Sequence, residues 1–330
     1  MKKNNFWQKL KSTGKPILAL APMAGFTDSV FRRICKKYGA DVLYSEMVSA
    51  TALYYSDRIG IQKKGKQDKN PTLELMNFNR RAERYYVIQL FGSKPEHFAA
   101  AAKIINDKVR PDGIDINFGC PVSKIIKQGA GADLMKNLAK SRAVIEAVLS
   151  ATDLPVSIKI RSKSGDVSAL DFLKNISDLP ISAVMIHGRT LNQGFAGACD
   201  FKIISAARKY FSGVILANGG INSLITAQEA LKESKADGLG LARGVLGRPW
   251  LFKEIKKNKQ IDLKLTQIFK LIIEQAKEAK KTKGENALIE LRKHLVWYVQ
   301  GLEGASKMRE KLVAVSNLQE LKKIIKEYKK

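Results

Sequence analysis

The chain has 330 residues, of which 45% are hydrophobic, so it is long enough to bury a full core and to form one large domain with a smaller one. Its 58 Lys and Arg residues outnumber 31 Asp and Glu, and the formal net charge of +27 favours a polyanionic partner, although a lysine-rich solvated surface alone would give the same value. The sequence has no apolar run of about 18 residues and no apolar segment near its amino terminus, which excludes a membrane span and a secretory signal and predicts a cytoplasmic protein.

Short strand-like runs alternate with amphipathic helical patterns from residue 15 to residue 257. The predicted strands are Ile17–Ala21, Val42–Ser45, Tyr86–Phe91, Gly113–Phe118, Val156–Arg161, Ala183–His187, Val214–Ala217 and Gly238–Leu241. The clearest helical patterns between them are Asp28–Tyr38, Pro95–Val109, Ser141–Ala151, Asp200–Tyr210 and Ser223–Glu233. This alternation predicts a parallel sheet, and eight units fit a closed (β/α)8 TIM barrel better than an open doubly wound sheet. No GxGxxG motif follows the first strand, which further disfavours a dinucleotide-binding fold.

The strand pattern ends near residue 257, and only helical spacing of apolar residues follows. Examples are Ile268, Leu271 and Ile272, and then Leu288, Leu291, Leu295 and Val299. We therefore predict an α/β catalytic TIM barrel over residues 1–257 and a small all-helical domain over residues 258–330. The polar, basic segment Ile61–Asn70 is expected to form a loop that interrupts the second unit of the barrel.

Polar residues stand at the carboxyl ends of the predicted strands, where barrel enzymes place their chemistry. They include Ser45 and Glu46, Gln89, Asn117 and Cys120, Lys159 and Arg161, His187 and Arg189, Asn218, Gly219 and Gly220, and Arg243. A lysine in a barrel mouth is costly to bury unless it meets a negative charge or an electron-rich ligand. The glycine-containing turns after the last two strands are typical of a phosphate site. Together these residues suit a bound flavin mononucleotide.

Eight segments carry a family resemblance. They are "APMAGFTDSVFR", "SEMVSA", "VIQLFGSKPE", "DINFGCPVSKIIKQGAGADLMKN", "VSIKIR", "IHGRTLNQGFAGACDF", "LANGGI" and "ARGVLGRPWLF". In this order and spacing, the chain from about Leu18 to Phe252 resembles the bacterial tRNA-dihydrouridine synthases, which depend on FMN, and "LRKHLVWYVQGLEGASKMRE" continues the resemblance more weakly. The resemblance implies that reduced FMN passes a hydride to carbon 6 of a uracil in folded tRNA, that a cysteine protonates carbon 5, and that NADPH reduces the flavin again.

The resemblance also implies a role for each matching residue. Cys120 would be the general acid. The cofactor residues would be Pro22, Met23 and Ala24 along the flavin ring, Gln89 and Lys159 at its polar edge, His187 near its phosphate side, and Asn218, Gly219, Gly220, Ala242 and Arg243 around the phosphate. Gly220 stands where many members have Asp, and we expect backbone N–H groups to make that contact. Asn117 and Arg161 would contact the uracil or the flavin edge, and Lys293 and Arg309 would hold RNA.

The position of Cys120 suits a proton donor. It follows a predicted strand and stands between Gly119 and Pro121, so a stiff turn sets its direction. A thiol with an ordinary pKa of about 8.5 stays mostly protonated at neutral pH and is still a better acid than a hydroxyl. Of the other cysteines, Cys35 lies on an apolar helix face and is expected in the core, and Cys199 has no assigned role. The three cysteines form no zinc motif, and no metal site is predicted.

Other interpretations remain open at this point. His294 and Trp297, three residues apart on a predicted helix, are expected to pack, with contact to RNA as the alternative. The RNA substrate is tRNA or ribosomal RNA. An FMN-dependent barrel reductase of a small pyrimidine is a second functional class, and an RNA-binding protein without catalysis is a third. The sequence indicates no obligate protein partner, and we expect a monomer.

Overall fold

The computed structural model describes residues 5–58 and 71–328. Eight parallel strands close into a barrel in the order β1-β10-β9-β8-β5-β4-β3-β2. Their bounds are β1 (Ile17–Leu20), β2 (Val42–Ser49), β3 (Tyr86–Phe91), β4 (Gly113–Phe118), β5 (Val156–Arg161), β8 (Ala183–His187), β9 (Val214–Asn218) and β10 (Gly238–Leu241). The predicted TIM barrel is therefore confirmed. The largest difference is in β2, which continues to Ser49 through an irregularity between Tyr44 and Met47.

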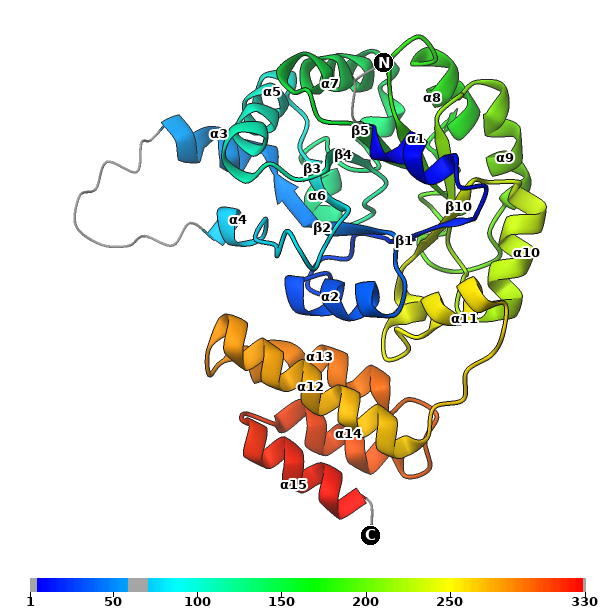
Figure 1. The fold of residues 1–330 in the computed structure, drawn as a ribbon. Coiled ribbons are helices and arrows are strands. Elements are labelled where there is room, and N and C mark those ends of the chain that lie inside the picture. Colours follow the sequence, from blue (N-terminus) through cyan, green and yellow to red (C-terminus); the bar gives the residue numbers. More distant parts are fainter. Residues whose placement is uncertain (1–4, 59–70, 329–330) are drawn as a thin grey trace.

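Helices follow the strands, and most of them cover the outside of this barrel (Figure 1). They are α2 (Ser29–Lys37), α3 (Ala50–Arg58), α4 (Pro71–Glu74), α5 (Pro95–Ile104), α6 (Ser123–Ile126), α7 (Leu138–Ala151), α8 (Ala169–Asn175), α9 (Phe201–Ala206), α10 (Leu224–Ser234) and α11 (Leu251–Lys257). Capping residues define several starts: the Asp28 side chain accepts a hydrogen bond from Phe31 N, and the Ser223 side chain accepts one from Thr226 N. The predicted helix from Pro95 to Val109 changes into a π-helical turn after Ile104. The pair β6 (Lys163–Ser164) and β7 (Val167–Ser168) forms a small hairpin after β5.

The short helix α1 (Phe6–Lys11) closes the amino-terminal end of the barrel. Phe6 and Trp7 share a buried cluster with Ile17, Val42 and Val214, which are the first residues of their strands. Because apolar side chains fill this end in the described part of the chain, we expect a ligand to enter from the carboxyl ends of the strands. The polar residues at that end are therefore the candidates for the functional site.

Four helices follow the barrel: α12 (Leu265–Lys283), α13 (Ala287–Tyr298), α14 (Ala305–Ala314) and α15 (Leu318–Tyr328). Their apolar faces form a second core, which also takes in Val30 and Trp250 from the barrel side. In Figure 1 this group lies beside α2, and ion pairs join α12 to that helix, at 2.7 Å between Arg33 Nη1 and Glu278 Oε1 and at 2.8 Å between Lys283 Nζ and Asp28 Oδ2. An all-helical region after the barrel is confirmed, while the division into domains at residue 257 stays a prediction.

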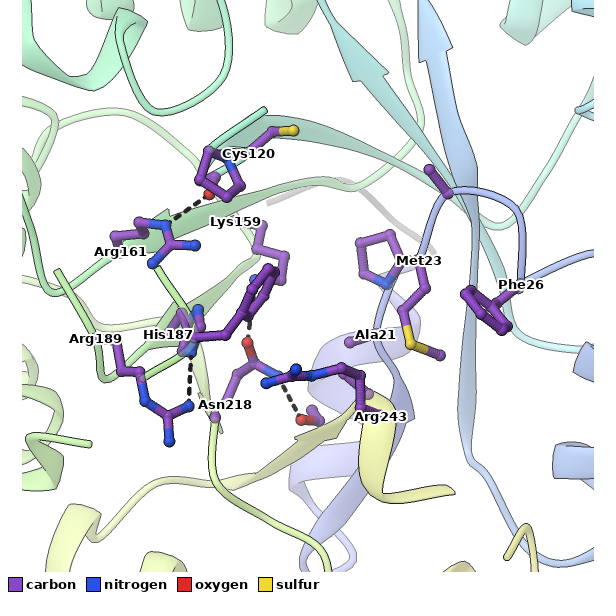
Figure 2. A pocket seen from close by; sticks show the side chains of 18 of the residues that line it. Ala21, Met23, Phe26, Cys120, Lys159, Arg161, His187, Arg189, Asn218 and Arg243 are labelled. Carbon is purple, nitrogen blue, oxygen red and sulfur yellow. Dashed lines mark hydrogen bonds between the residues drawn. The ribbon is translucent and has the colours of Figure 1, made fainter. Parts of the chain in front are cut away.

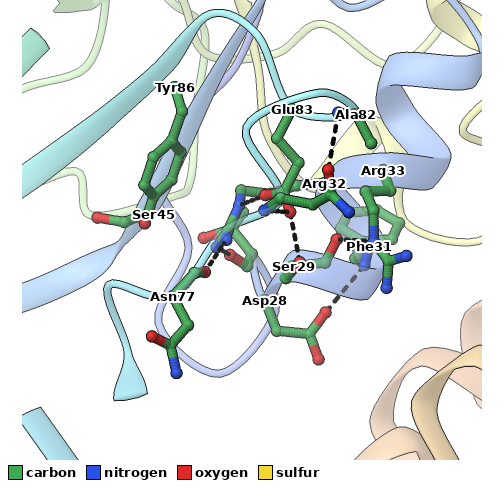
Figure 3. A network of polar contacts seen from close by, with 12 residues as sticks. Asp28, Ser29, Phe31, Arg32, Arg33, Ser45, Asn77, Ala82, Glu83 and Tyr86 are labelled. Atoms are coloured by element: carbon green, nitrogen blue, oxygen red, sulfur yellow. Dashed lines mark hydrogen bonds and ion pairs between the residues drawn. The ribbon is translucent and has the colours of Figure 1, made fainter. Parts of the chain in front are cut away.

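A buried network anchors α2, which supports the helical region (Figure 3). Arg32 Nε lies 2.6 Å from Glu83 Oε2, and the guanidinium also donates to the carbonyls of Thr27 and Asn77, each at 2.7 Å. Both charged side chains are almost fully buried, so removing one of them would leave an uncompensated charge. This network ties α2 to the segment before β3.

The predicted loop Ile61–Asn70 lies outside the described residues. Among the helices in the described part of the chain, none is long and apolar enough to cross a membrane.

Candidate active site

A cavity of about 550 Å³ opens at the carboxyl ends of the strands. Its volume is within the range of ligand sites, roughly 300–1,000 Å³. All eleven predicted cofactor residues line it: Pro22, Met23, Ala24, Gln89, Lys159, His187, Asn218, Gly219, Gly220, Ala242 and Arg243. Asn117, Cys120 and Arg161 line it as well. Figure 2 shows Met23 and Phe26 on one side of the cavity, with Arg161, His187 and Arg189 on the other. The structure thus brings together residues from every part of the barrel.

The turn after β9 requires glycine at position 219. Gly219 has φ +106°, and a Cβ atom there would lie 2.5 Å from His187 Cδ2 and 2.7 Å from Cys199 Sγ. Gly220 has φ +70°, which also favours glycine. A Cβ on Gly244, after β10, would lie 2.1 Å from the carbonyl oxygen of Ile221, so the two turns are in close contact. All three glycines line the cavity, so both turns border the space that a ligand would occupy.

The charge around this turn is positive. Arg189 and Arg243 line the cavity beside it, and Arg189 Nη1 lies 3.5 Å from His187 Nε2. Burial, followed by the charges of Lys159, Arg161, Arg189 and Arg243, lowers the pKa of His187 far below its ordinary value, so its ring is neutral at physiological pH. A site with two guanidinium groups and open backbone suits a phosphate.

Lys159 projects into the middle of the cavity from β5. Its Nζ donates to Asn218 Oδ1 at 3.1 Å, and Asn218 Nδ2 in turn donates to the Gly240 carbonyl at 2.7 Å. Burial, with a smaller contribution from the Arg161 charge, lowers the pKa of Lys159 to about 8. An ammonium group has three donors, so Lys159 can also bind the polar edge of a ligand. The prediction that this lysine is not on the solvated surface is confirmed.

Cys120 lies in a braced turn after β4. Asn117 Oδ1 accepts hydrogen bonds from the backbone N–H of Gly119, at 3.0 Å, and from that of Cys120, at 2.9 Å. Arg161 Nε donates to the Gly119 carbonyl at 2.8 Å. Burial raises the pKa of the Cys120 thiol above its ordinary value, so the thiol carries its proton at neutral pH. The turn therefore presents a protonated thiol to the cavity from a fixed backbone.

Arg161 has a structural role in addition to its predicted one. Its side chain is only 1% exposed, and besides Gly119 its guanidinium donates to the carbonyls of Thr190, at 2.8 Å, and Gly194, at 2.9 Å. It therefore joins the cysteine turn to the loop after β8. Contact between Arg161 and a ligand stays a prediction.

Three aromatic residues of the cavity wall were not predicted as part of the site. Phe195 is 56% exposed, and the Arg243 guanidinium lies 4.4 Å from its ring centroid. Phe26 and Trp297 also line the cavity, the latter from α13. The exposed position of Phe195 in the glycine-rich stretch "NQGFAG" was the available signal. Nothing local in the sequence places Trp297 at the barrel mouth.

The two predicted RNA residues lie outside the cavity. Lys293 is exposed on α13, and its Nζ lies 5.7 Å from the centroid of the Phe26 ring, beside the mouth. Arg309 is exposed on α14. His294 is only 2% exposed and lies against Phe26 and Phe31, which confirms that it packs. Cys35 is buried, as predicted.

Comparisons with known proteins identify the family of this chain. The family model "Dihydrouridine synthase (Dus)" matches residues 19–330. The chain is 32% identical to "Probable tRNA-dihydrouridine synthase 1" of Synechocystis sp., covering 92% of this chain and 84% of that protein. It is 31% identical to "Probable tRNA-dihydrouridine synthase" of Aquifex aeolicus, covering 94% and 95%. The solved structure of TcOYE with pHBA shares the fold at a TM-score of 0.52 and 12% identity, covering 76% of this chain and 91% of that one. The match to the family model and the identity to these full-length relatives show that the chain belongs to the dihydrouridine synthase family.

Proposed function

We propose that this protein is a tRNA-dihydrouridine synthase that reduces the 5,6 double bond of uridines in tRNA, with FMN as cofactor and NADPH as the source of electrons. The observation that carries the proposal is the protonated thiol of Cys120, held by a hydrogen-bonded turn, beside a cavity lined by basic residues and a glycine turn. The names of the relatives support the same reaction.

The residues of the cavity fit FMN. Gly219 and Gly220 leave the backbone open where a terminal phosphate would bind, and Arg243 and Arg189 supply the opposite charge. Lys159 offers an ammonium donor for the oxygen and nitrogen atoms of a flavin ring. FMN bound by these residues would supply, in its reduced form, the hydride for carbon 6 of the uracil.

Cys120 completes the reduction with a proton. Addition of hydride at carbon 6 leaves negative charge on carbon 5 and the adjoining carbonyl, and the thiol transfers its proton to carbon 5. The raised pKa of Cys120 ensures that this proton is present before the reaction begins. Lys159 and Arg161 lie near enough to stabilise the resulting thiolate, which then takes a proton from water. The base must leave its stack to reach the cavity, which favours nucleotides in tRNA loops.

Positive charge around the mouth is suited to holding the RNA. Residues 253–330 hold 20 Lys and Arg against 10 Asp and Glu, and Lys293 lies directly beside the entrance. We propose that the helical domain, with Lys293 and Arg309, contacts tRNA phosphates while the base enters the cavity. The net charge of +27 favours this over a reductase of a free pyrimidine, whereas ribosomal RNA would satisfy the same charge. The proposed enzyme is a cytoplasmic monomer.

Reduction of three substrates by one protein preparation tests this proposal. Purified protein loaded with FMN is incubated with NADPH and tRNA from a strain that makes no dihydrouridine, with ribosomal RNA from that strain, and with free uracil. Nucleosides are then measured by mass spectrometry. We expect dihydrouridine in tRNA alone. Preferential reduction of ribosomal RNA or of free uracil would replace the proposal with the corresponding alternative.

A further inference from the structure

A chain of buried hydrogen bonds runs beneath the cavity and ends at the cysteine turn. Ser157 Oγ donates to Asp115 Oδ1 at 2.6 Å, and Gln89 Nε2 donates to Asp115 Oδ2 at 2.7 Å. Asn117 Nδ2 then donates to Gln89 Oε1 at 2.9 Å, and Asn117 Oδ1 accepts from the N–H groups of the turn. Each hydrogen bond in this chain therefore has a defined donor and a defined acceptor.

The Asp115 carboxylate fixes which group donates and which accepts in each of these hydrogen bonds. An ionised Asp can only accept hydrogen bonds, whereas an amide can offer either its oxygen or its NH2 group after a flip. Because Asp115 accepts from Gln89, the oxygen of Gln89 is turned to Asn117, and the oxygen of Asn117 is in turn left to accept from the backbone. If Gln89 flipped, its NH2 group would face that of Asn117. A compensating flip of Asn117 would then face its NH2 group to two N–H donors.

We propose that Asp115 is a positioning residue for the reaction, which acts through Gln89 and Asn117 to hold the backbone turn that presents the Cys120 thiol. The inference rests on the proposed function, because it assigns Asp115 to the proton-transfer half of that reaction. Asp115 itself faces neither cysteine nor ligand.

The surroundings of Asp115 support this role. Its side chain is 0% exposed, and burial raises its pKa to about 6, although the hydrogen bonds from Gln89 and Ser157 and the charge of Lys159 favour the ionised form. At neutral pH the group is therefore an acceptor. A buried carboxylate is costly, and these contacts offset that cost.

Two substitutions at Asp115 separate hydrogen-bond direction from charge. In Asp115→Asn the amide oxygen can still accept from Gln89 while its NH2 group donates to the Ser157 hydroxyl, which can accept as well as donate. That variant loses the negative charge and keeps an acceptor for the Gln89 NH2 group. Asp115→Ala removes the acceptor and leaves Gln89 free to flip. Ser157→Ala is the matched control, because it removes the other hydrogen bond to Asp115 and leaves the chain from Asp115 to the turn intact.

The first measurement needs no substrate. Alkylation of Cys120 by iodoacetamide is followed against pH by peptide mass spectrometry, with the Cys199 peptide as an internal reference. In Asp115→Ala the loosened turn exposes the thiol, so we expect faster alkylation of Cys120 and a pH profile shifted downward, as its raised pKa returns toward the ordinary value. Asp115→Asn and Ser157→Ala should follow the wild type.

The second measurement is dihydrouridine formation in a single turnover of pre-reduced enzyme with tRNA. With rates compared per bound and reduced FMN, we expect Asp115→Ala to be slower by about a hundredfold, which is the scale for a misplaced reacting group. Asp115→Asn should keep most of the rate. Wild-type protein that forms no dihydrouridine would refute the proposed function, while the alkylation experiment would still test the role of Asp115.

Two results would overturn the inference. Unchanged alkylation and turnover in Asp115→Ala would show that the carboxylate does not position the turn. An equal loss of turnover rate in Asp115→Asn and Asp115→Ala would show that the charge of Asp115 matters and that its role as a hydrogen-bond acceptor does not. If Asp115→Ala does not fold, Asp115→Val replaces it, because a β-branched side chain suits a strand and also offers Gln89 no acceptor.

Discussion

Substitution of Gly219 by alanine should remove FMN binding and lower stability. The residue has φ +106°, a conformation that side chains other than glycine rarely adopt, and such strain costs about 1–3 kcal/mol. The added Cβ would also lie 2.5 Å from His187 Cδ2 and 2.7 Å from Cys199 Sγ. Both atoms belong to partly or fully buried side chains, so the turn itself must move. A moved turn no longer offers its N–H groups to a phosphate.

Gly220→Ala is a matched control for this experiment. Gly220 also has a positive φ of +70°, but its Cβ would lie 3.5 Å from Cys199 Sγ and 3.9 Å from Arg189 Nη2, which are ordinary contacts. It therefore carries backbone strain without the clash. Gly14→Ala, at φ +67° with no atom within 4 Å, reports the strain alone at a site far from the cavity in the sequence.

The assay has two parts. Flavin content per protein after gel filtration, followed by titration with added FMN, measures binding, and urea unfolding of the flavin-free protein measures the free energy of unfolding. We expect little or no retained FMN in Gly219→Ala, a smaller loss in Gly220→Ala, and none in Gly14→Ala. All three variants should lose stability, with the largest loss in Gly219→Ala. Wild-type FMN affinity in Gly219→Ala would refute the placement of the phosphate at this turn.

Three further predictions concern the thiol, the RNA surface and the helical region. Cys120→Ala should bind FMN and accept electrons from NADPH but form dihydrouridine at least about a hundredfold more slowly, and wild-type turnover would contradict its role as the acid. Replacing Lys293 and Arg309 together by Glu should preserve FMN content and NADPH oxidation, weaken tRNA binding, and reduce the log–log salt slope by roughly one for each lost phosphate contact; an unchanged slope would move the RNA surface elsewhere. Burial lowers the pKa of His294 to about 4. Between pH 6.5 and pH 4 the unfolded chain therefore binds a proton at this residue and the folded chain does not. The free energy of unfolding should fall by about 3 kcal/mol as the pH falls over that range. His294→Phe should remove this part of the pH dependence in urea unfolding, and an identical dependence in the variant would show that His294 is not its source.

The barrel and the polar residues at its carboxyl-terminal mouth could be predicted because each rests on local sequence. Alternation of strands and helices indicates the fold, and glycine-containing turns at strand ends indicate the phosphate site. The predicted strands agree with the structure to within one residue, except for the longer β2. That strand continues through an irregularity between Tyr44 and Met47, which the residue types there do not predict.

The contacts between distant segments could not be predicted in this way. Trp297 reaches the cavity only because α13 packs against the loop after β1, and the sequence of the helix does not reveal that docking. Asp115 looks like any polar residue in an alternating strand, and its connection to Cys120 depends on side chains from β3, β4 and β5. Arg161 likewise carries no signal that it joins two loops. Such roles depend on which strands are neighbours in space.

We propose that this chain reduces uridine in RNA and that Cys120 supplies the proton. The most direct test of this claim is mass spectrometry of the nucleosides from unmodified tRNA, after incubation with FMN-loaded protein and NADPH. We expect some uridines to gain two hydrogens with the wild-type protein and almost none to do so with Cys120→Ala in the same time. Uridines that stay unchanged with wild-type protein, while its flavin continues to oxidise NADPH, would contradict the claim.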